Sequence, residues 1–168
     1  MLTKLDGLSE YDRRRPVTAT GTNLLGLVKH LAGEEYGYLG ETFAHPPLIR
    51  PTWFRDDPYT EIDMWATPDE SSEHIVGVYR AACAHADETI RGHHLDSPGR
   101  VPHWPANRQA SLGSMLVLMV GETAQHAGHA DIVREIIDNT AEQEGLPREA
   151  AATRDRRERV QAAADHFR

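Results

Sequence analysis

The sequence predicts an all-α protein, a four-helix bundle with long connections and a short first helix. Three observations support this fold class. Apolar residues recur at helical spacing in three long stretches, and proline-rich segments separate these stretches. No segment shows the alternation of apolar and polar residues that indicates a half-buried strand. The length of 168 residues is that of one ordinary domain.

The first long helix is expected to begin after a cap at Thr22 or Asn23 and to run to His45, where Pro46 and Pro47 must end it. One face of it carries a stripe of residues spaced four, three, four and three apart: Gly26, His30, Gly33, Gly37 and Gly40. Glycine inside a helix costs about 1 kcal/mol relative to alanine. The stripe therefore indicates a packing or site requirement.

The other elements follow in order. The proline-rich, aromatic segment 46–66 predicts a long ordered loop. Thr67 to Glu70 resembles a capping box with proline at the first helical position, so the second long helix is expected over 67–92. After a loop over 93–110, the third long helix is expected to start at Ser111. We expect the bundle to occupy residues 1–144 and a charged helical extension to occupy 145–168.

Composition narrows the function classes. Lysine and arginine number 18 against 26 acidic residues, a formal net charge of −8, which argues against nucleic-acid binding. No apolar run approaches the roughly 20 residues of a membrane span, and the N-terminus lacks the apolar core of a signal peptide. The single Cys83 cannot form an internal disulfide, so a cytoplasmic location is expected. Histidine is abundant, at 10 residues, which suggests metal binding or proton chemistry.

The predicted site lies in the third long helix. Glu122 and His126 are one turn apart on its apolar face, and a buried carboxylate requires a positive partner. His30 on the glycine stripe completes a set of two imidazoles and one carboxylate, which suits zinc, nickel, iron or manganese and leaves positions open for substrate. A buried hydrogen bond between Glu122 and His126 is the alternative. His129 is a fourth ligand, a hydrogen-bonding partner of a ligand, or a general base, of which we expect the second.

Other histidines are expected on the surface or in loops: His45, His74, His85, His93, His94, His103 and His166. Among these, His103 beside Trp104 is placed at the mouth of a pocket. Glu70 and His74 share the spacing of Glu122 and His126, but the capping role of Glu70 explains it without a metal.

Four segments carry a resemblance to a known family: GTNLLGLVKHLAGEEYGYLG, DDPYTEIDMWATPDES, IVGVYRAACAHADETI and ETAQHAGHADIVREIID. From about Asp6 to Asp138 the chain resembles the DinB-like superfamily of metal-binding four-helix bundles, in its actinobacterial uncharacterised branch. The resemblance implies a divalent ion held by His30, Glu122 and His126. Many relatives have histidine where this chain has Glu122. The glutamate is similar to the mycothiol-dependent maleylpyruvate isomerase type and favours the thiol-linked members.

The superfamily includes metal-dependent thiol S-transferases that use mycothiol or bacillithiol, so the resemblance implies a metal-bound thiolate as nucleophile. One departure is that the usual first helix begins further upstream, whereas Met1 lies only five residues before Asp6. A truncated helix, an upstream start or a covering second subunit would explain this. The last predicts a homodimer.

Three functions are compatible with these residues. The first is a thiol transferase or isomerase acting on a small-molecule thiol and an electrophile, with Trp53, Trp65 and Trp104 shaping the pocket. The second is a metal-dependent hydrolase with Glu34 or His129 as base. The third is a non-catalytic metal-binding or stress-response protein. A di-iron carboxylate site is disfavoured, because that class uses glutamate and histidine three residues apart. Binding to DNA is not expected.

Overall fold

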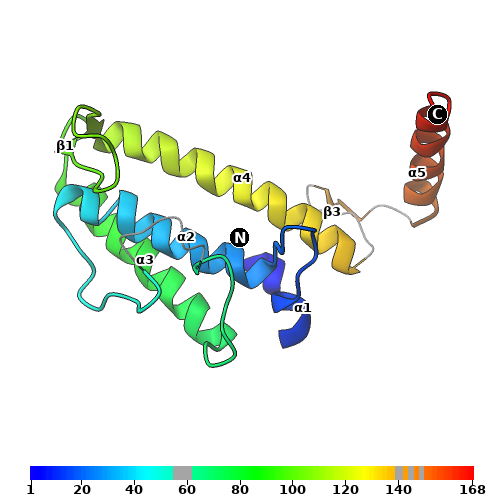
Figure 1. Ribbon diagram of the computed structural model, residues 1–168, viewed down its shortest axis with the longest axis horizontal. Helices are drawn as coiled ribbons and strands as arrows, with labels where there is room; N and C mark the ends of the chain where they lie inside the picture. The colour runs from blue at the N-terminus through cyan, green and yellow to red at the C-terminus, as the bar shows by residue number, and fades with distance from the viewer. Residues whose placement is uncertain (55–61, 139–141, 144–145, 148–149) are drawn as a thin grey trace.

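The computed structural model describes residues 1–54, 62–138, 142–143, 146–147 and 150–168. Three long helices lie side by side (Figure 1) and confirm the predicted all-α bundle: α2 (Leu24–Tyr38), α3 (Ser72–Gly92) and α4 (Leu112–Asp138). The central helix α2 contacts both α3 and α4. Two pairs of two-residue strands add only local pairing: β1 (Pro98–Gly99) with β2 (Ala110–Ser111), and β3 (Glu142–Gln143) with β4 (Leu146–Pro147).

The N-terminal part of the bundle is short, as predicted. It consists of the 3-10 turn η1 (Leu2–Leu5) and the five-residue helix α1 (Glu10–Arg14), which Ser9 caps by accepting a hydrogen bond from the Asp12 amide. Leu5 packs into the core against α2 and α4 residues. The Arg134 guanidinium of α4 donates to the carbonyls of Lys4 and Asp6, so α4 holds the N-terminal segment in place.

Helix α2 begins where predicted and ends earlier. The Asn23 side chain caps it by accepting from the Gly26 amide at 2.8 Å. The helix ends at Tyr38 rather than at His45, and the short turn η2 (Glu41–Phe43) follows. A Cβ at Gly40 would lie 2.4 Å from the Tyr36 carbonyl oxygen, so the chain can leave the helix here only without a side chain. Buried Leu39 and Phe43 continue the apolar spacing through this turn, which explains the misplaced end.

Helix α3 starts later than predicted. Ser71 is its cap and accepts from the His74 amide at 3.1 Å, so the expected start at 67 is wrong. The Glu70 carboxylate does accept from the Thr67 amide at 2.8 Å. This contact closes a turn that precedes the helix. Helix α4 begins one residue after the predicted Ser111.

The core lies between the three long helices. Buried residues of α2 supply much of it: Leu24, Leu25, Leu27, Val28 and Leu31. Ile75 of α3 and Ala130 and Val133 of α4 pack in one cluster with the α2 residues from Leu24 to Val28. Helix α5 (Ala150–Asp165) is drawn away from this core (Figure 1), and nearly all of its described side chains are exposed. Among the described residues, no helix is long and apolar enough to cross a membrane.

Candidate metal centre

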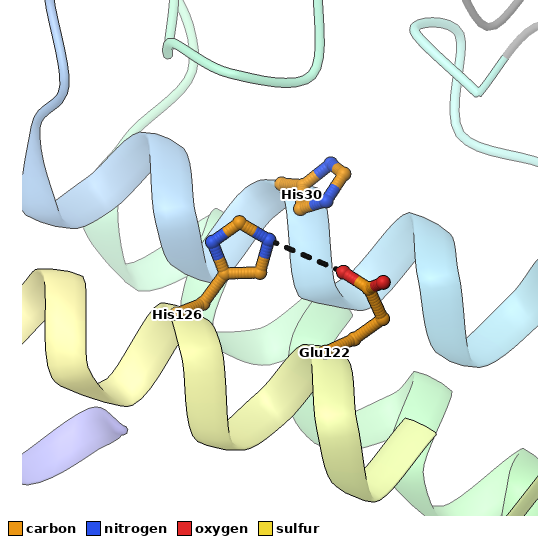
Figure 2. A group of neighbouring side chains, drawn as sticks. All are labelled: His30, Glu122 and His126. Atoms are coloured by element: carbon orange, nitrogen blue, oxygen red, sulfur yellow. Dashed lines mark ion pairs between the residues drawn. The ribbon is translucent and has the colours of Figure 1, made fainter. Parts of the chain in front are cut away.

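Two helices bring three potential ligands together. His30 comes from α2, and Glu122 and His126 come from successive turns of α4 (Figure 2). One ligand atom of each lies within 4.8 Å of the other two. The rings of His30 and His126 meet edge to face, with centroids 4.8 Å apart. The three side chains predicted from the sequence as ligands are therefore neighbours.

The three side chains differ in burial. His126 is buried, at 7% exposure, and the His30 side chain is largely covered. Glu122, expected to point into the core, instead keeps 36% of its side chain exposed. The buried residues of α4 fall on one face of the helix, and by helical spacing Glu122 lies at the edge of that face. The site is thus closed on the His126 side and accessible at Glu122.

A fourth residue, Asp63, orients His30. Its carboxylate accepts a hydrogen bond from Nδ1 of His30 at 2.6 Å. Burial lowers the pKa of His30, but the Asp63 hydrogen bond and the nearby carboxylates of Glu34 and Glu122 outweigh it, so the net shift is upward. Burial would raise the pKa of Asp63, and the His30 contact lowers it overall. The proton on Nδ1 leaves the lone pair of Nε2 free for a ligand.

Burial favours the uncharged form of two further groups, His126 and Glu34. Burial and the charge of His30 lower the pKa of His126, with Glu122 opposing. Burial raises the pKa of Glu34 to about 7; His30 opposes this shift, and Glu122 and Asp63 add to it. Near neutral pH the centre therefore combines a neutral imidazole at His126 with a carboxyl group that exchanges its proton readily.

The donor set fits a divalent metal ion. Nε2 of His126 and Oε2 of Glu122 are 3.6 Å apart, too far for a hydrogen bond. Bonds of about 2.0–2.2 Å to one ion would place neighbouring ligand atoms roughly 3–3.5 Å from each other. Two imidazoles and a carboxylate that converge in this way suit zinc or a similar ion.

A family model for mycothiol S-transferases matches residues 1–139. The chain belongs to this family. The match spans η1 to the end of α4 and includes His30, Asp63, Glu122 and His126. It agrees with the resemblance to DinB-like bundles related to mycothiol enzymes. Searches of curated proteins and of solved structures found no match.

In this member of the mycothiol S-transferase family, the other predicted site residues lie at different depths. His129 is exposed, with its ring 5.4 Å from that of His126. Trp53 is buried, at 5% exposure, in a cluster with Ala32, Tyr36 and Ala82. Trp53 therefore packs in the core with residues of α2 and α3.

A group of aromatic side chains connects the end of α2 with the loop before α4. The Tyr38 hydroxyl of α2 is 3.5 Å from Nε2 of His103, and its ring lies 6.2 Å from that of Trp104. The Arg108 guanidinium stacks on Trp104 at 3.4 Å. Burial raises the pKa of Tyr38, and the charges of Glu34 and Glu122 raise it further. His30, Glu34 and Tyr38 are spaced four residues apart on α2, so Tyr38 lies on the same face of the helix as His30, two turns away. Trp65, half exposed, lies two residues after Asp63.

A second histidine group holds the turn after α2 against α3. His45, His85 and Glu88 also have potential ligand atoms within 4.8 Å of one another. The two rings stack at 4.0 Å with an interplanar angle of 19°. His85 donates from Nε2 to the His45 carbonyl at 2.8 Å, and Nδ1 of His45 bonds the Thr89 hydroxyl. Stacked rings direct their in-plane lone pairs in parallel, so this group serves packing. Both histidines are half-buried; His45 lies in a loop, as expected, and His85 lies on α3.

Proposed function

We propose that this protein is a divalent-metal-dependent S-transferase that uses mycothiol or a similar small thiol. The observation that carries the proposal is the convergence of His30, Glu122 and His126 in a chain of the mycothiol S-transferase family. Zinc is the proposed metal, and nickel, iron or manganese suit the same donors. Three protein ligands leave a coordination position for the thiol.

Each residue has a defined role in this proposal. His30 binds through Nε2, because Asp63 holds the proton on Nδ1. His126 and Glu122 complete the ligand set from α4. A bound divalent ion lowers the pKa of a coordinated thiol, so that sulfur becomes a nucleophile near neutral pH. Glu34, with a pKa of about 7, accepts the thiol proton.

The nucleophilic sulfur comes from the small molecule and not from Cys83. Burial raises the pKa of the Cys83 thiol, and the nearby Glu35 carboxylate raises it further. A thiol with a raised pKa is a poor nucleophile. Cys83 also lies on α3, whereas the proposed ligands lie on α2 and α4.

The aromatic loop and the outer face of α4 suggest partners. We propose that Trp104 and His103, together with Tyr38, line the place where thiol and electrophile meet. On α4, a set of exposed apolar side chains lies opposite the buried face: Val117, Val120, Ile132 and Ile136. We propose that a second copy of the chain covers this surface. A reducing cytoplasm suits thiol chemistry of this kind.

The test begins with metal analysis of the wild type, His126→Ala and His129→Gln. We expect one ion per chain in the wild type and in His129→Gln, and loss of the ion in His126→Ala. A cobalt-substituted sample is then titrated with mycothiol, and a thiolate-to-cobalt charge-transfer band is expected. Bound metal without this band would favour the hydrolase or the non-catalytic alternative. No bound metal in the wild type would refute the proposed site.

A further inference from the structure

The ammonium group of Lys29 is completely buried, at 0% exposure of the residue. It donates three hydrogen bonds, to the carbonyl oxygens of Ile62 and Trp65, each at 3.0 Å, and to Oε2 of Glu70 at 2.8 Å. Burying a charge is unfavourable unless every donor finds an acceptor. Lys29 therefore fastens the segment 62–65 to the middle of α2.

The carbonyl of Met64, which lies between Ile62 and Trp65 in the sequence, also faces α2. The Met64 oxygen accepts from Nδ2 of Asn23 at 3.1 Å. A Cβ at Gly26 would lie 1.8 Å from this oxygen, so the segment rests directly on the helix backbone. The carbonyls of residues 62, 64 and 65 are thus all bound by side chains of α2 or of its cap Asn23, which leaves little freedom for Asp63 among them.

Asp63 is the hydrogen-bond acceptor of His30. We infer that Lys29 is a positioning residue for the metal centre: by holding segment 62–65 on α2, it keeps the Asp63 carboxylate on Nδ1 of His30. The inference rests on the proposed function, because it assumes that His30 is a ligand. Without the ammonium, two carbonyls and the Glu70 carboxylate lose their donor, the segment relaxes, and Asp63 no longer holds the His30 proton on Nδ1.

A double-mutant cycle tests this inference. The variants are Lys29→Met, Asp63→Asn and the double variant, and the zinc dissociation constant is measured by competition with a chromophoric chelator. Loss of a partner of a ligand histidine weakens metal binding about 10- to 100-fold. We expect Asp63→Asn and Lys29→Met each to fall in this range. The double variant should bind zinc within about twofold of Asp63→Asn, because Lys29 acts through Asp63.

Arg134→Met is the matched control, because Arg134 also binds backbone carbonyls, those of Lys4 and Asp6, away from the centre. It should lower stability and leave zinc affinity unchanged. Nitrogen-15 shifts of His30, recorded without metal at a pH where the ring is neutral, give a second readout. Lys29→Met and Asp63→Asn should mix the two ring tautomers, and Arg134→Met should not.

Several results would overturn the inference. Unchanged zinc affinity in Lys29→Met would do so. So would a double variant in which the fold-change in the zinc dissociation constant equals the product of the two single fold-changes. Should Lys29→Met not fold, Glu70→Gln replaces it in the cycle. It removes the ion pair that holds Lys29, and unchanged affinity there would equally overturn the inference. A wild type that binds no zinc would refute the proposed function and this inference with it.

Discussion

The rings of His30 and His126 lie in different electrostatic environments although their centroids are 4.8 Å apart. The hydrogen bond to Asp63 and the nearby carboxylates hold the pKa of His30 above its usual value against the effect of burial. Burial and the charge of His30 lower the pKa of His126. A proton on one ring thus disfavours a proton on the other. Once both rings are neutral, each has one unprotonated nitrogen that is available to a divalent ion.

Glu122 offers a direct test of the donor set at the level of one residue. Glu122→Gln keeps the shape of the side chain and removes its charge, so we expect zinc binding to weaken at least about tenfold. Glu122→His supplies another donor that zinc accepts and should retain most of the affinity. Chelator competition measures both. Equal affinity in wild type and Glu122→Gln would exclude Glu122 as a ligand.

At the scale of the helix, the loop before α3 packs directly on the glycine stripe of α2. The backbone at Met64 lies against Gly26, the Trp53 ring lies 3.3 Å from a Cβ built at Gly33, and Phe54 covers Gly37. The absence of side chains on this face lets the loop approach closely enough for Asp63 to reach His30. The expected packing or site requirement for the stripe is therefore observed in the structure.

The stripe predicts opposite effects of the same substitution in two helices. Gly26→Ala places a methyl group against the Met64 carbonyl, and we expect it to lower the free energy of unfolding by about 1–3 kcal/mol. At Gly77 in α3 a Cβ meets nothing within 4 Å. Gly77→Ala should therefore raise the free energy of unfolding by up to about 1 kcal/mol. Urea denaturation distinguishes the two, and similar behaviour would refute the close approach at Gly26.

The ion pair of Lys29 and Glu70 links α2 to the turn before α3 and predicts a pH dependence. Burial would raise the pKa of Glu70, but the hydrogen bonds from Lys29 and Thr67 lower it below its ordinary 4.5. A carboxyl group with a lowered pKa in the folded state stabilises the protein above its unfolded pKa. This contribution is lost as the pH falls through the folded value.

Glu70→Gln measures that contribution. At neutral pH we expect the wild type to be more stable than Glu70→Gln by about 1–3 kcal/mol. Urea denaturation at a series of pH values should show this difference shrinking as the pH falls below about 4.5, the ordinary pKa of the group. A difference that stays constant down to acid pH would mean that Glu70 is not held ionised by Lys29.

At the scale of the whole molecule, the centre and the tail are separate. The proposed ligands and Asp63 lie on α2, on α4 and in the loop before α3, and the proposed substrate-lining residues His103 and Trp104 lie in the loop before α4. The family match ends at residue 139, whereas α5 starts at Ala150. The division into a bundle over 1–144 and an extension over 145–168 stays a prediction, because residues 139–141, 144–145 and 148–149 lie outside the described part of the chain.

Truncation tests this division. Deleting residues 145–168 removes α5, whose described side chains are mostly exposed. We expect the melting temperature to stay within about 2 °C of the full chain, because little buried surface is lost, and the metal content to be unchanged. Differential scanning calorimetry and metal analysis provide the measurements. A large fall in either would show that the tail supports the bundle.

The sequence predicted the elements better than their ends. Helical spacing of apolar residues located α2, α3 and α4, because each helix buries one face. The same spacing predicted an end of α2 later than the observed Tyr38. The reason is that Leu39 and Phe43 are buried and continue the apolar pattern, although they lie in the turn after the helix. The pattern at Thr67 to Glu70 was taken for a helix start, whereas Glu70 instead closes a turn and pairs with Lys29.

The sequence by itself predicted which face of each long helix is apolar and that His30, Glu122 and His126 are candidates for one site. Helical periodicity is local, so it can be derived from the order of residues. Only the tertiary structure decided that Asp63 orients His30, that Lys29 is buried, and that Glu122 lies at the edge of the α4 contact. These features depend on where a non-periodic loop rests on α2, and no spacing along the chain encodes that position.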